Sequence, residues 1–313
     1  MKIGLLTDSL GAMPIDEVLR VAAQAGVRMV EFACGNWSAA PHIELDAMLQ
    51  SDARRREFVA KLEDHGLTIS ALNCSGNQLH PGAVGKQHHA GVEKTIELAR
   101  RLEVERVVMM SGLPGAPGDS HPNWIVTDWP PECMSILEYQ WTDVIVPYWK
   151  GLVKFANDRG IRKLCLELHG QQAVYNQASF KRLRDAVGET VGVNYDPSHP
   201  MWMGADPLAG VRQLGGAIYH VHAKDTRIER AVASVDGLLD ARSPTLASER
   251  SWNYVTLGYG HDALWWKQFC LELQRAGYDD VLSIEHEDTA MTPIEGVLKS
   301  VRLLQDVAIN VLA

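Results

Sequence analysis

The chain has 313 residues, 46% of them hydrophobic and 22% charged, and its formal net charge is −9. This length suits one large α/β barrel of about 250 residues or more, and the acidic balance disfavours a nucleic-acid phosphate backbone as partner. No run approaches the roughly 20 apolar residues of a membrane span, and the opening MKIGLLTDSL does not resemble a signal peptide. The five cysteines are odd in number and form no CxxC pair, so we expect free thiols and a cytoplasmic location.

Short apolar runs alternate with longer amphipathic segments along the whole chain. Most of the apolar runs are continuous rather than alternating, which is typical of parallel strands covered on both faces. The sequence predicts eight strands, at residues 2–6, 29–34, 68–73, 106–111, 163–168, 191–195, 218–223 and 281–285.

The segments between these strands are predicted to be helices. Several end at a glycine before the next strand, at Gly26, Gly160 and Gly277, which is a C-cap signature. The first strand is followed by TDSLG, which lacks the GxGxxG of a dinucleotide-binding fold. Eight alternating units of this kind predict the α/β class and a (β/α)8 TIM barrel, as a single domain over residues 1–313.

Two connections, residues 112–137 and 226–257, are long. Both follow the carboxyl end of a predicted strand, the fourth and the seventh, where barrels build their active sites. Trp124, Trp129 and Trp252 lie in them, and exposed indoles are unusual without something to stack on. We therefore expect loops that cover a substrate, with solvated insertions as the alternative.

Four consecutive predicted strands end in side chains that bind metals. Glu167, Asp196, His222 and Glu285 terminate the last four apolar runs, and in a parallel barrel such positions converge on one rim. Three carboxylates there would repel one another strongly unless a cation lay between them. The sequence therefore predicts one divalent ion in an oxygen-rich site, with Mn²⁺ preferred and Mg²⁺, Co²⁺ or Zn²⁺ as alternatives.

Several short motifs around these residues carry a family resemblance. They are LELH at 166–169, DPSH at 196–199, HVHAKD at 220–225, GYGH at 258–261 and SIEHED at 283–288. In these motifs the chain resembles the xylose-isomerase-like barrel superfamily, in the branch of sugar phosphate isomerases and epimerases. The resemblance covers essentially the whole chain in order, but its motifs do not specify a substrate.

The resemblance implies roles for individual residues. In the ketose 3-epimerases of the superfamily two strand-end glutamates bind the metal and also move the proton, and here they correspond to Glu167 and Glu285. A metal held by a carbonyl and its neighbouring hydroxyl acidifies the C–H between them and stabilises the enediolate that forms. His199 is expected to hydrogen-bond the substrate, or alternatively to orient Asp196 from behind.

Further side chains are candidates for contact with the substrate. His169 lies two residues after Glu167 and shares its direction if the strand continues that far. Lys224 and Arg227 are suited to substrate oxygens, a carboxylate or a phosphate, although lone basic residues on a loop are as often solvated or paired.

Two polar residues within predicted strands are also candidates. Asn73 ends the third strand and Glu31 lies within the second, so both are placed to point at a substrate. The expected partner is a small sugar or sugar-derived molecule, with no nucleic acid and no membrane, and the resemblance allows a homo-oligomer.

The expected function is that of a metal-dependent sugar isomerase or epimerase, with alternatives. Inosose dehydratases of the same superfamily show a His-x-Lys-Asp-x-Arg element similar to residues 222–227, so a dehydratase or lyase performing β-elimination on a keto-sugar, inosose or keto-glycoside is the alternative. An endonuclease IV-like enzyme would need three zinc ions and a basic face, which the net charge of −9 disfavours. A barrel without catalytic function is disfavoured by the presence of all four ligands.

Overall fold

The structure, a computed structural model, describes residues 1–309. Its eight parallel strands form a closed barrel in the order β1-β10-β7-β6-β5-β4-β3-β2, with helices between them, which confirms the predicted (β/α)8 class. By contacts the described chain divides into two compact units, residues 1–32, 57–70 and 195–309, and residues 33–56 and 71–194. The single domain over residues 1–313 stays a prediction.

The first unit contains four strands that are consecutive in the barrel order. β1 (Lys2–Leu6) pairs in parallel with β2 (Met29–Ala33) and with β10 (Val281–Ile284), and β10 pairs with β7 (Ile218–Ala223). The last residue of β2 belongs to the second unit. The remaining elements of the first unit are η1 (Thr7–Leu10), α1 (Ile15–Ala25), α8 (Ser198–Trp202), α9 (Pro207–Leu214), η3 (Gly215–Ala217), β8 (Asp225–Ile228), α10 (Arg230–Asp236), η4 (Pro244–Glu249), β9 (Trp252–Val255), α11 (Ala263–Arg275) and α12 (Pro293–Val307).

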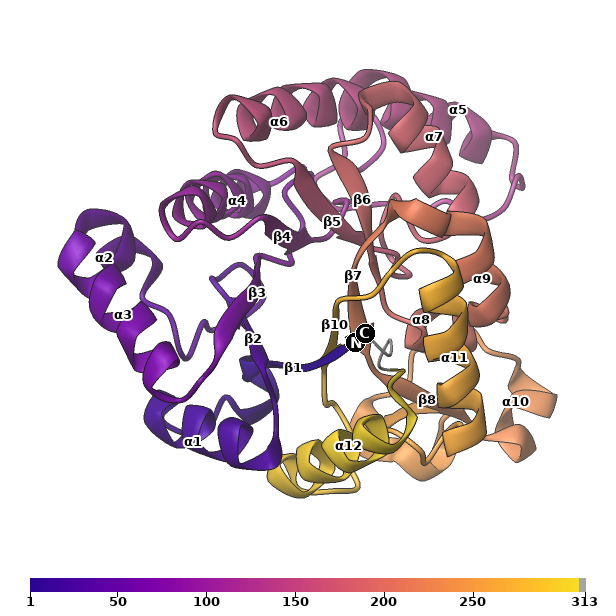
Figure 1. Cartoon of the computed structure of the whole chain (residues 1–313). Helices are drawn as coiled ribbons and strands as arrows, with labels where there is room; N and C mark the ends of the chain where they lie inside the picture. Colours follow the sequence, from indigo (N-terminus) through magenta and orange to yellow (C-terminus); the bar gives the residue numbers. More distant parts are fainter. Residues whose placement is uncertain (310–313) are drawn as a thin grey trace. The chain divides into compact units, whose positions relative to one another are not determined.

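In this unit α11 packs against both α9 and α12, and α12 also contacts β1 and β10 (Figure 1). The predicted glycine stop of α1 is confirmed, because Gly26 caps the helix at φ 93°, a left-handed conformation that glycine adopts without steric cost.

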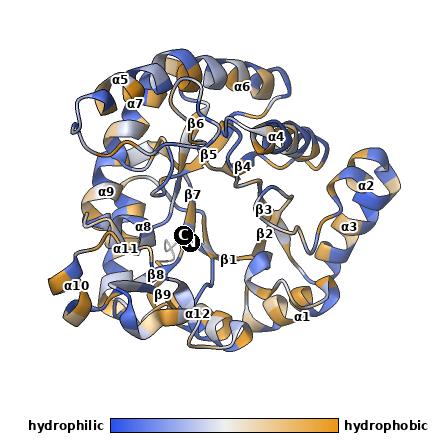
Figure 2. Cartoon of the chain, turned by 180° about the vertical axis from the view of Figure 1, so that it is seen from behind, coloured by the Kyte–Doolittle hydropathy of each residue, from blue (hydrophilic) through white to orange (hydrophobic). Residues whose placement is uncertain are grey.

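The second unit holds a run of three parallel pairings, β3 (Thr68–Asn73) with β4 (Arg106–Met109), β4 with β5 (Lys163–Glu167), and β5 with β6 (Val191–Tyr195). The start of β3, the end of β6 and part of α3 (Asp52–Asp64) belong to the first unit. The outer helices α4 and α6 carry alternating hydrophilic and hydrophobic bands (Figure 2), as helices packed on one side do. The helices of this unit are α2 (Leu45–Gln50), α4 (Ala83–Arg101), α5 (Glu132–Tyr139), the π-helix η2 (Gln140–Ile145), α6 (Val146–Asp158) and α7 (Gln177–Val187).

The predicted strands agree closely with the observed ones. β1, β3, β6 and β7 have the predicted bounds, whereas β2, β4, β5 and β10 end one or two residues earlier. Met110, Ser111 and Leu168 lie beyond the strand ends and are still buried. Hydrophobic patterning records burial rather than backbone pairing, so it overestimates strand length where a buried loop follows.

The connection after β4 has no helix or strand over residues 110–131, but α5 begins before the predicted end of the loop. The side chain of Gln140 donates to the carbonyl oxygens of Pro114 (3.0 Å) and Asn123 (2.7 Å), which ties this segment to the π-helix. Trp129 is 73% exposed, so its predicted role over a substrate stays a prediction.

The connection after β7 is more ordered than the sequence predicted. It contains α10, η4 and an antiparallel pair, β8 with β9, in the register Asp225↔Val255. The ring of Trp252 in β9 stacks on that of Trp202 in α8, with centroids 4.8 Å apart and an interplanar angle of 9°. The sequence missed both strands because they are only four residues long and mix polar with apolar side chains.

Two further expectations concern the chain as a whole. All five cysteines are free, and Cys34, Cys74 and Cys165 are buried as expected. Within residues 1–309 no helix combines the length and the apolar character that crossing a bilayer requires.

Candidate active site

His222, near the carboxyl end of β7, is buried between two carboxylates. Its Nε2 lies 3.0 Å from both oxygens of Glu31 in β2, and its Nδ1 lies 3.0 Å from Oε2 of Glu285, which directly follows β10. Because the Glu31 carboxylate accepts hydrogen bonds, Nε2 carries a hydrogen. Nδ1 then faces Glu285 with its lone pair, and the contact between these two atoms needs a proton or a metal ion between them.

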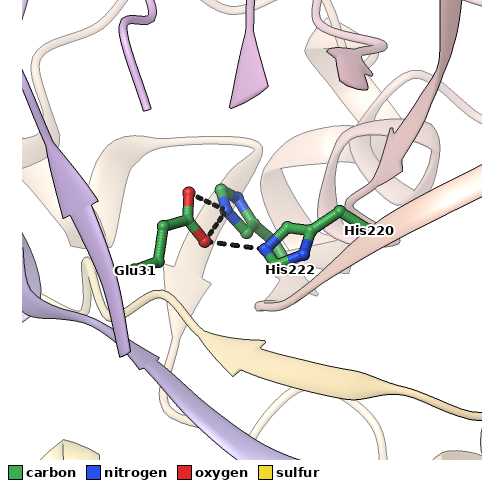
Figure 3. A group of neighbouring side chains, drawn as sticks. All are labelled: Glu31, His220 and His222. Atoms are coloured by element: carbon green, nitrogen blue, oxygen red, sulfur yellow. Dashed lines mark hydrogen bonds and ion pairs between the residues drawn. The ribbon is translucent and has the colours of Figure 1, made fainter. Parts of the chain in front are cut away.

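Glu31 is 0% exposed and is enclosed by hydrogen-bond donors (Figure 3). Its Oε2 accepts from His220 Nε2 (2.8 Å), His222 Nε2 (3.0 Å) and Ser283 Oγ (2.9 Å). Burial raises the pKa of Glu31, but the charges and hydrogen bonds of His222 and His220 outweigh it and hold the pKa well below its usual range. Glu31 is therefore an ionised buried group that faces two histidines, whereas the sequence suggested that it points to the substrate.

Asp196, the residue after β6, is held by its neighbours in the first unit. Its Oδ1 accepts from the backbone N–H of Ser198 (2.8 Å), and its Oδ2 lies 3.1 Å from His199 Nε2. The other ring nitrogen of His199, Nδ1, lies 3.4 Å from Trp202 Nε1 and 3.1 Å from the hydroxyl of Tyr254. An indole N–H only donates, so His199 Nδ1 accepts and the hydrogen of this imidazole is on Nε2, the nitrogen that faces Asp196. This geometry favours the orienting role for His199, and direct contact with a substrate stays a prediction.

Three of the predicted ligands come together in the first unit. The ligand atoms of Asp196, His222 and Glu285 all lie within 4.8 Å of one another. Two ligands about 2.1 Å from one ion, at a right angle, are about 3 Å apart, and this is the separation of His222 Nδ1 and Glu285 Oε2, 3.0 Å. Donor types, spacing and the tautomer of His222 therefore fit a divalent cation.

Lys224 lies beside this group, 4% exposed. Its Nζ is 3.4 Å from Glu285 Oε2, 2.8 Å from Glu287 Oε2 and 4.2 Å from the ring centroid of Tyr254. Burial lowers the pKa of Lys224, but Glu285 and Glu287 raise it further, so that the pKa lies well above its usual value and the ammonium stays charged. Lys224 is thus a charge partner of Glu285, and its contact with a substrate stays a prediction.

Arg227 lies further from this group along β8. Its side chain is 48% exposed, and its Nη2 pairs with Glu229 Oε1 at 2.6 Å. Pairing is the alternative that the sequence left open for it, and its role in substrate binding stays a prediction.

The second unit carries the other predicted site residues. Glu167 ends β5 and is buried, and its Oε2 accepts from Asn194 Nδ2 at 3.0 Å, across the register pair Glu167↔Asn194. Asn194 was missed by the sequence analysis, although a polar residue two positions before Asp196 in a buried strand is a usable signal.

The two remaining candidates make local contacts. His169 Nδ1 contacts the carbonyl oxygen of Gly170, and Asn73 accepts from the backbone N–H of Ser75 at 2.9 Å. These contacts shape the turns that follow β5 and β3. Substrate binding by His169 and Asn73 stays a prediction.

Asp225 organises the segment that follows β9. Its buried carboxylate accepts from the backbone N–H groups of Gly258 (3.1 Å), Gly260 (3.2 Å) and His261 (3.0 Å), and lies 2.8 Å from His261 Nδ1. The motifs HVHAKD and GYGH, separate in the sequence, are therefore joined by one side chain.

We expect Asp225→Asn to lower the free energy of unfolding by about 2–4 kcal/mol, because an amide presents N–H to donors that need an acceptor. Denaturant unfolding measures this, with Asp128→Asn on the exposed loop as the control, expected to change stability by less than about 0.5 kcal/mol. Equal stability of the two variants would contradict the anchoring role of Asp225.

A closed parallel barrel, with Asp196, His222 and Glu285 close enough to one another to hold an ion, defines a (β/α)8 barrel with a candidate metal site. The chain belongs to the xylose isomerase-like TIM barrel family, whose model matches residues 19–307. The resemblance stated from the motifs is thereby confirmed. A protein of Bacillus subtilis (strain 168), "Uncharacterized protein YfiH", is 49% identical over 308 residues, which are 97% of this chain and 98% of that protein.

Solved structures of the same fold are similar over nearly their full length. The IolI protein with a bound zinc atom is 19% identical, with a TM-score of 0.68 and 98% of each chain covered. The probable 3-DHS dehydratase AsbF of Bacillus anthracis is 18% identical (TM-score 0.67, 97% and 99% covered), and a D-tagatose 3-epimerase-like protein is 20% identical (0.65, 98% and 98%). At these identities the similarity establishes the fold, and proteins that share it include sugar-modifying enzymes.

Proposed function

We propose that the protein is a divalent-metal-dependent isomerase or epimerase of a small sugar or sugar-derived carbonyl compound. The observation that carries the proposal is the 3.0 Å approach of His222 Nδ1 to Glu285 Oε2, while Glu31 holds the other ring nitrogen of His222. This arrangement fits a ligand pair sharing one ion. Asp196 is proposed as a third ligand from the same group.

Glu167 is proposed as the fourth ligand. It ends β5, the strand next to β6 in the barrel order, and it is a buried carboxylate with one oxygen accepting from Asn194. Asp196 directly follows β6, so the two carboxylates lie at the carboxyl ends of neighbouring strands. Mn²⁺ is the proposed ion, and Mg²⁺, Co²⁺ or Zn²⁺ would suit the same donors. The IolI protein, which has the same fold, binds a zinc atom, and this supports the proposal of a bound metal.

When bound, the ion would polarise a carbonyl and its neighbouring hydroxyl and so acidify the carbon between them. Glu167 and Glu285 are the two carboxylates proposed to move the proton, one removing it from that carbon and the other returning it on the opposite face. The ammonium of Lys224 lies 3.4 Å from Glu285 Oε2 and favours the negative charge of that carboxylate. His199 keeps Asp196 in place through Nε2.

β-Elimination on a keto-sugar, inosose or keto-glycoside is the second candidate, because it begins with the same proton removal. The buried ammonium of Lys224 favours it, since a fixed positive charge can stabilise a departing hydroxyl. The fold similarity to a probable dehydratase also supports it.

Metal content and proton exchange test the proposal together. Purified protein is analysed by elemental mass spectrometry, and ketoses and keto-glycosides are then incubated with it in D₂O. One equivalent of a divalent metal, with deuterium entering next to the carbonyl, is expected. Loss of water from the substrate would favour elimination over isomerisation. Protein that contains no metal after preparation with excess divalent metal would overturn the proposal.

A further inference from the structure

We propose that Glu31 is a positioning residue that fixes the tautomer of His222, so that Nδ1 is the atom offered to the metal. The inference rests on the proposed metal site but concerns residues behind it. Glu31 lies on β2 and His222 on β7, and Figure 3 shows both histidines of β7 directed at the Glu31 carboxylate.

The first step is the fixed position of the Glu31 carboxylate. Its Oε2 accepts from three donors, His220, His222 and Ser283, at 2.8–3.0 Å, and its Oε1 lies 3.0 Å from His222 Nε2. All four side chains are buried, so none of these hydrogen bonds competes with bulk water. Ser283 is the register partner of His222 in the β10–β7 pair, which sets its hydroxyl beside the imidazole.

The Glu31 carboxylate determines which ring nitrogen carries the hydrogen in His220 and in His222. A neutral imidazole carries one N–H, and a carboxylate only accepts. Glu31 therefore requires Nε2–H on both His220 and His222. For His222 this leaves Nδ1 as the lone-pair nitrogen, and Nδ1 is the atom 3.0 Å from Glu285. His220 has no such ligand role in the proposed site, and we infer that it shares with Ser283 the task of holding Glu31.

An amide at position 31 would not satisfy the two imidazoles as the carboxylate does. The glutamine of a Glu31→Gln variant has one acceptor oxygen and one NH₂ donor, so it cannot accept from both imidazoles in the same way. Both Glu31 oxygens lie 3.0 Å from His222 Nε2, so the NH₂ group would face His222 in either orientation of the amide. If His222 accepts from this group, its own hydrogen moves to Nδ1, which then has no lone pair for the metal.

We expect a second-site rescue that general destabilisation of the fold would not produce. Glu31→Gln is expected to weaken Zn²⁺ binding about 10- to 100-fold, the usual effect of removing a group that orients a metal ligand. In Glu31→Gln/His220→Phe the amide oxygen is free to turn to His222, so affinity should recover at least partly. His220→Phe alone removes one of the donors that hold Glu31 but leaves the carboxylate beside His222, so its affinity should fall less than that of Glu31→Gln.

The experiment measures Zn²⁺ affinity of wild type and the three variants by competition with a chelating dye, with thermal unfolding as the check on folding. In parallel, ¹⁵N NMR of the zinc-loaded wild type, labelled at histidine, reads the tautomer without any substitution. We expect the His222 proton on Nε2 and zinc on Nδ1.

Each outcome decides between the two proposals. A His222 proton on Nδ1 in the zinc-loaded wild type, or a folded Glu31→Gln variant with wild-type affinity, would overturn the positioning role and leave the metal site standing. A double variant that binds zinc no better than Glu31→Gln would also count against it. Wild-type protein that binds no divalent ion would overturn the proposed function, and this inference with it.

Discussion

Asp196→Asn is expected to release the divalent metal and to lower kcat/KM by about a thousandfold. The asparagine Oδ1 can still accept from the backbone N–H of Ser198, so the turn after β6 should persist. The variant loses the charge proposed to bind the cation, and a bound metal contributes several kcal/mol of charge stabilisation in the transition state, where 1.36 kcal/mol corresponds to a factor of ten. Elemental analysis and steady-state kinetics on the ketose that exchanges deuterium measure both effects.

The control for this variant is Asp128→Asn, which makes the same chemical change on the exposed connection after β4. It should keep wild-type metal content and activity. A folded Asp196→Asn protein with a full equivalent of metal and more than a tenth of wild-type kcat/KM would contradict the assignment of Asp196 as a ligand.

Glu167→Gln and Glu285→Gln should each slow the exchange of the substrate's carbon-bound proton with solvent. The rate should fall by about 10²- to 10⁴-fold, the range of general acid–base contributions. Each removes a proposed base as well as a proposed ligand, so metal content should fall too. Measuring exchange in protein saturated with Mn²⁺ separates the two effects, because added metal restores occupancy but not the missing base. Deuterium uptake followed by mass spectrometry gives the rates.

Glu189→Gln is the matched control, because the Glu189 side chain is 91% exposed in the same unit as Glu167. It should exchange at the wild-type rate. If Glu167→Gln exchanges normally while Glu285→Gln does not, Glu285 alone moves the proton and a two-face epimerisation by this pair is excluded.

The strand positions were predictable from the sequence because strands covered on both faces consist of continuous apolar runs. Such a run can be recognised from neighbouring residues alone. The four candidate ligands were predictable for a related reason. Each is a polar residue that ends such a run, at Glu167, Asp196, His222 and Glu285, and a parallel barrel places all strand ends of one polarity on one rim.

The β8–β9 pair was not predictable in the same way. Its strands are four residues each, and their stability comes from contacts made at a distance, such as Trp252 on Trp202 and the Tyr254 hydroxyl on His199. The pattern of hydrophobic residues within a short segment does not indicate which distant residues will contact it.

The sequence by itself determined the fold class and the residue types that end its strands, because backbone periodicity and burial are properties of neighbouring residues. Only the tertiary structure decided that Glu31 faces two histidines, that Lys224 pairs with Glu285, and which nitrogen of His222 faces Glu285. Glu31 and His220 are 189 positions apart on strands that are not neighbours in the barrel. Their hydrogen bond exists because closing the sheet turns inward-facing side chains of distant strands toward one another, and no pattern along the chain encodes which of them meet.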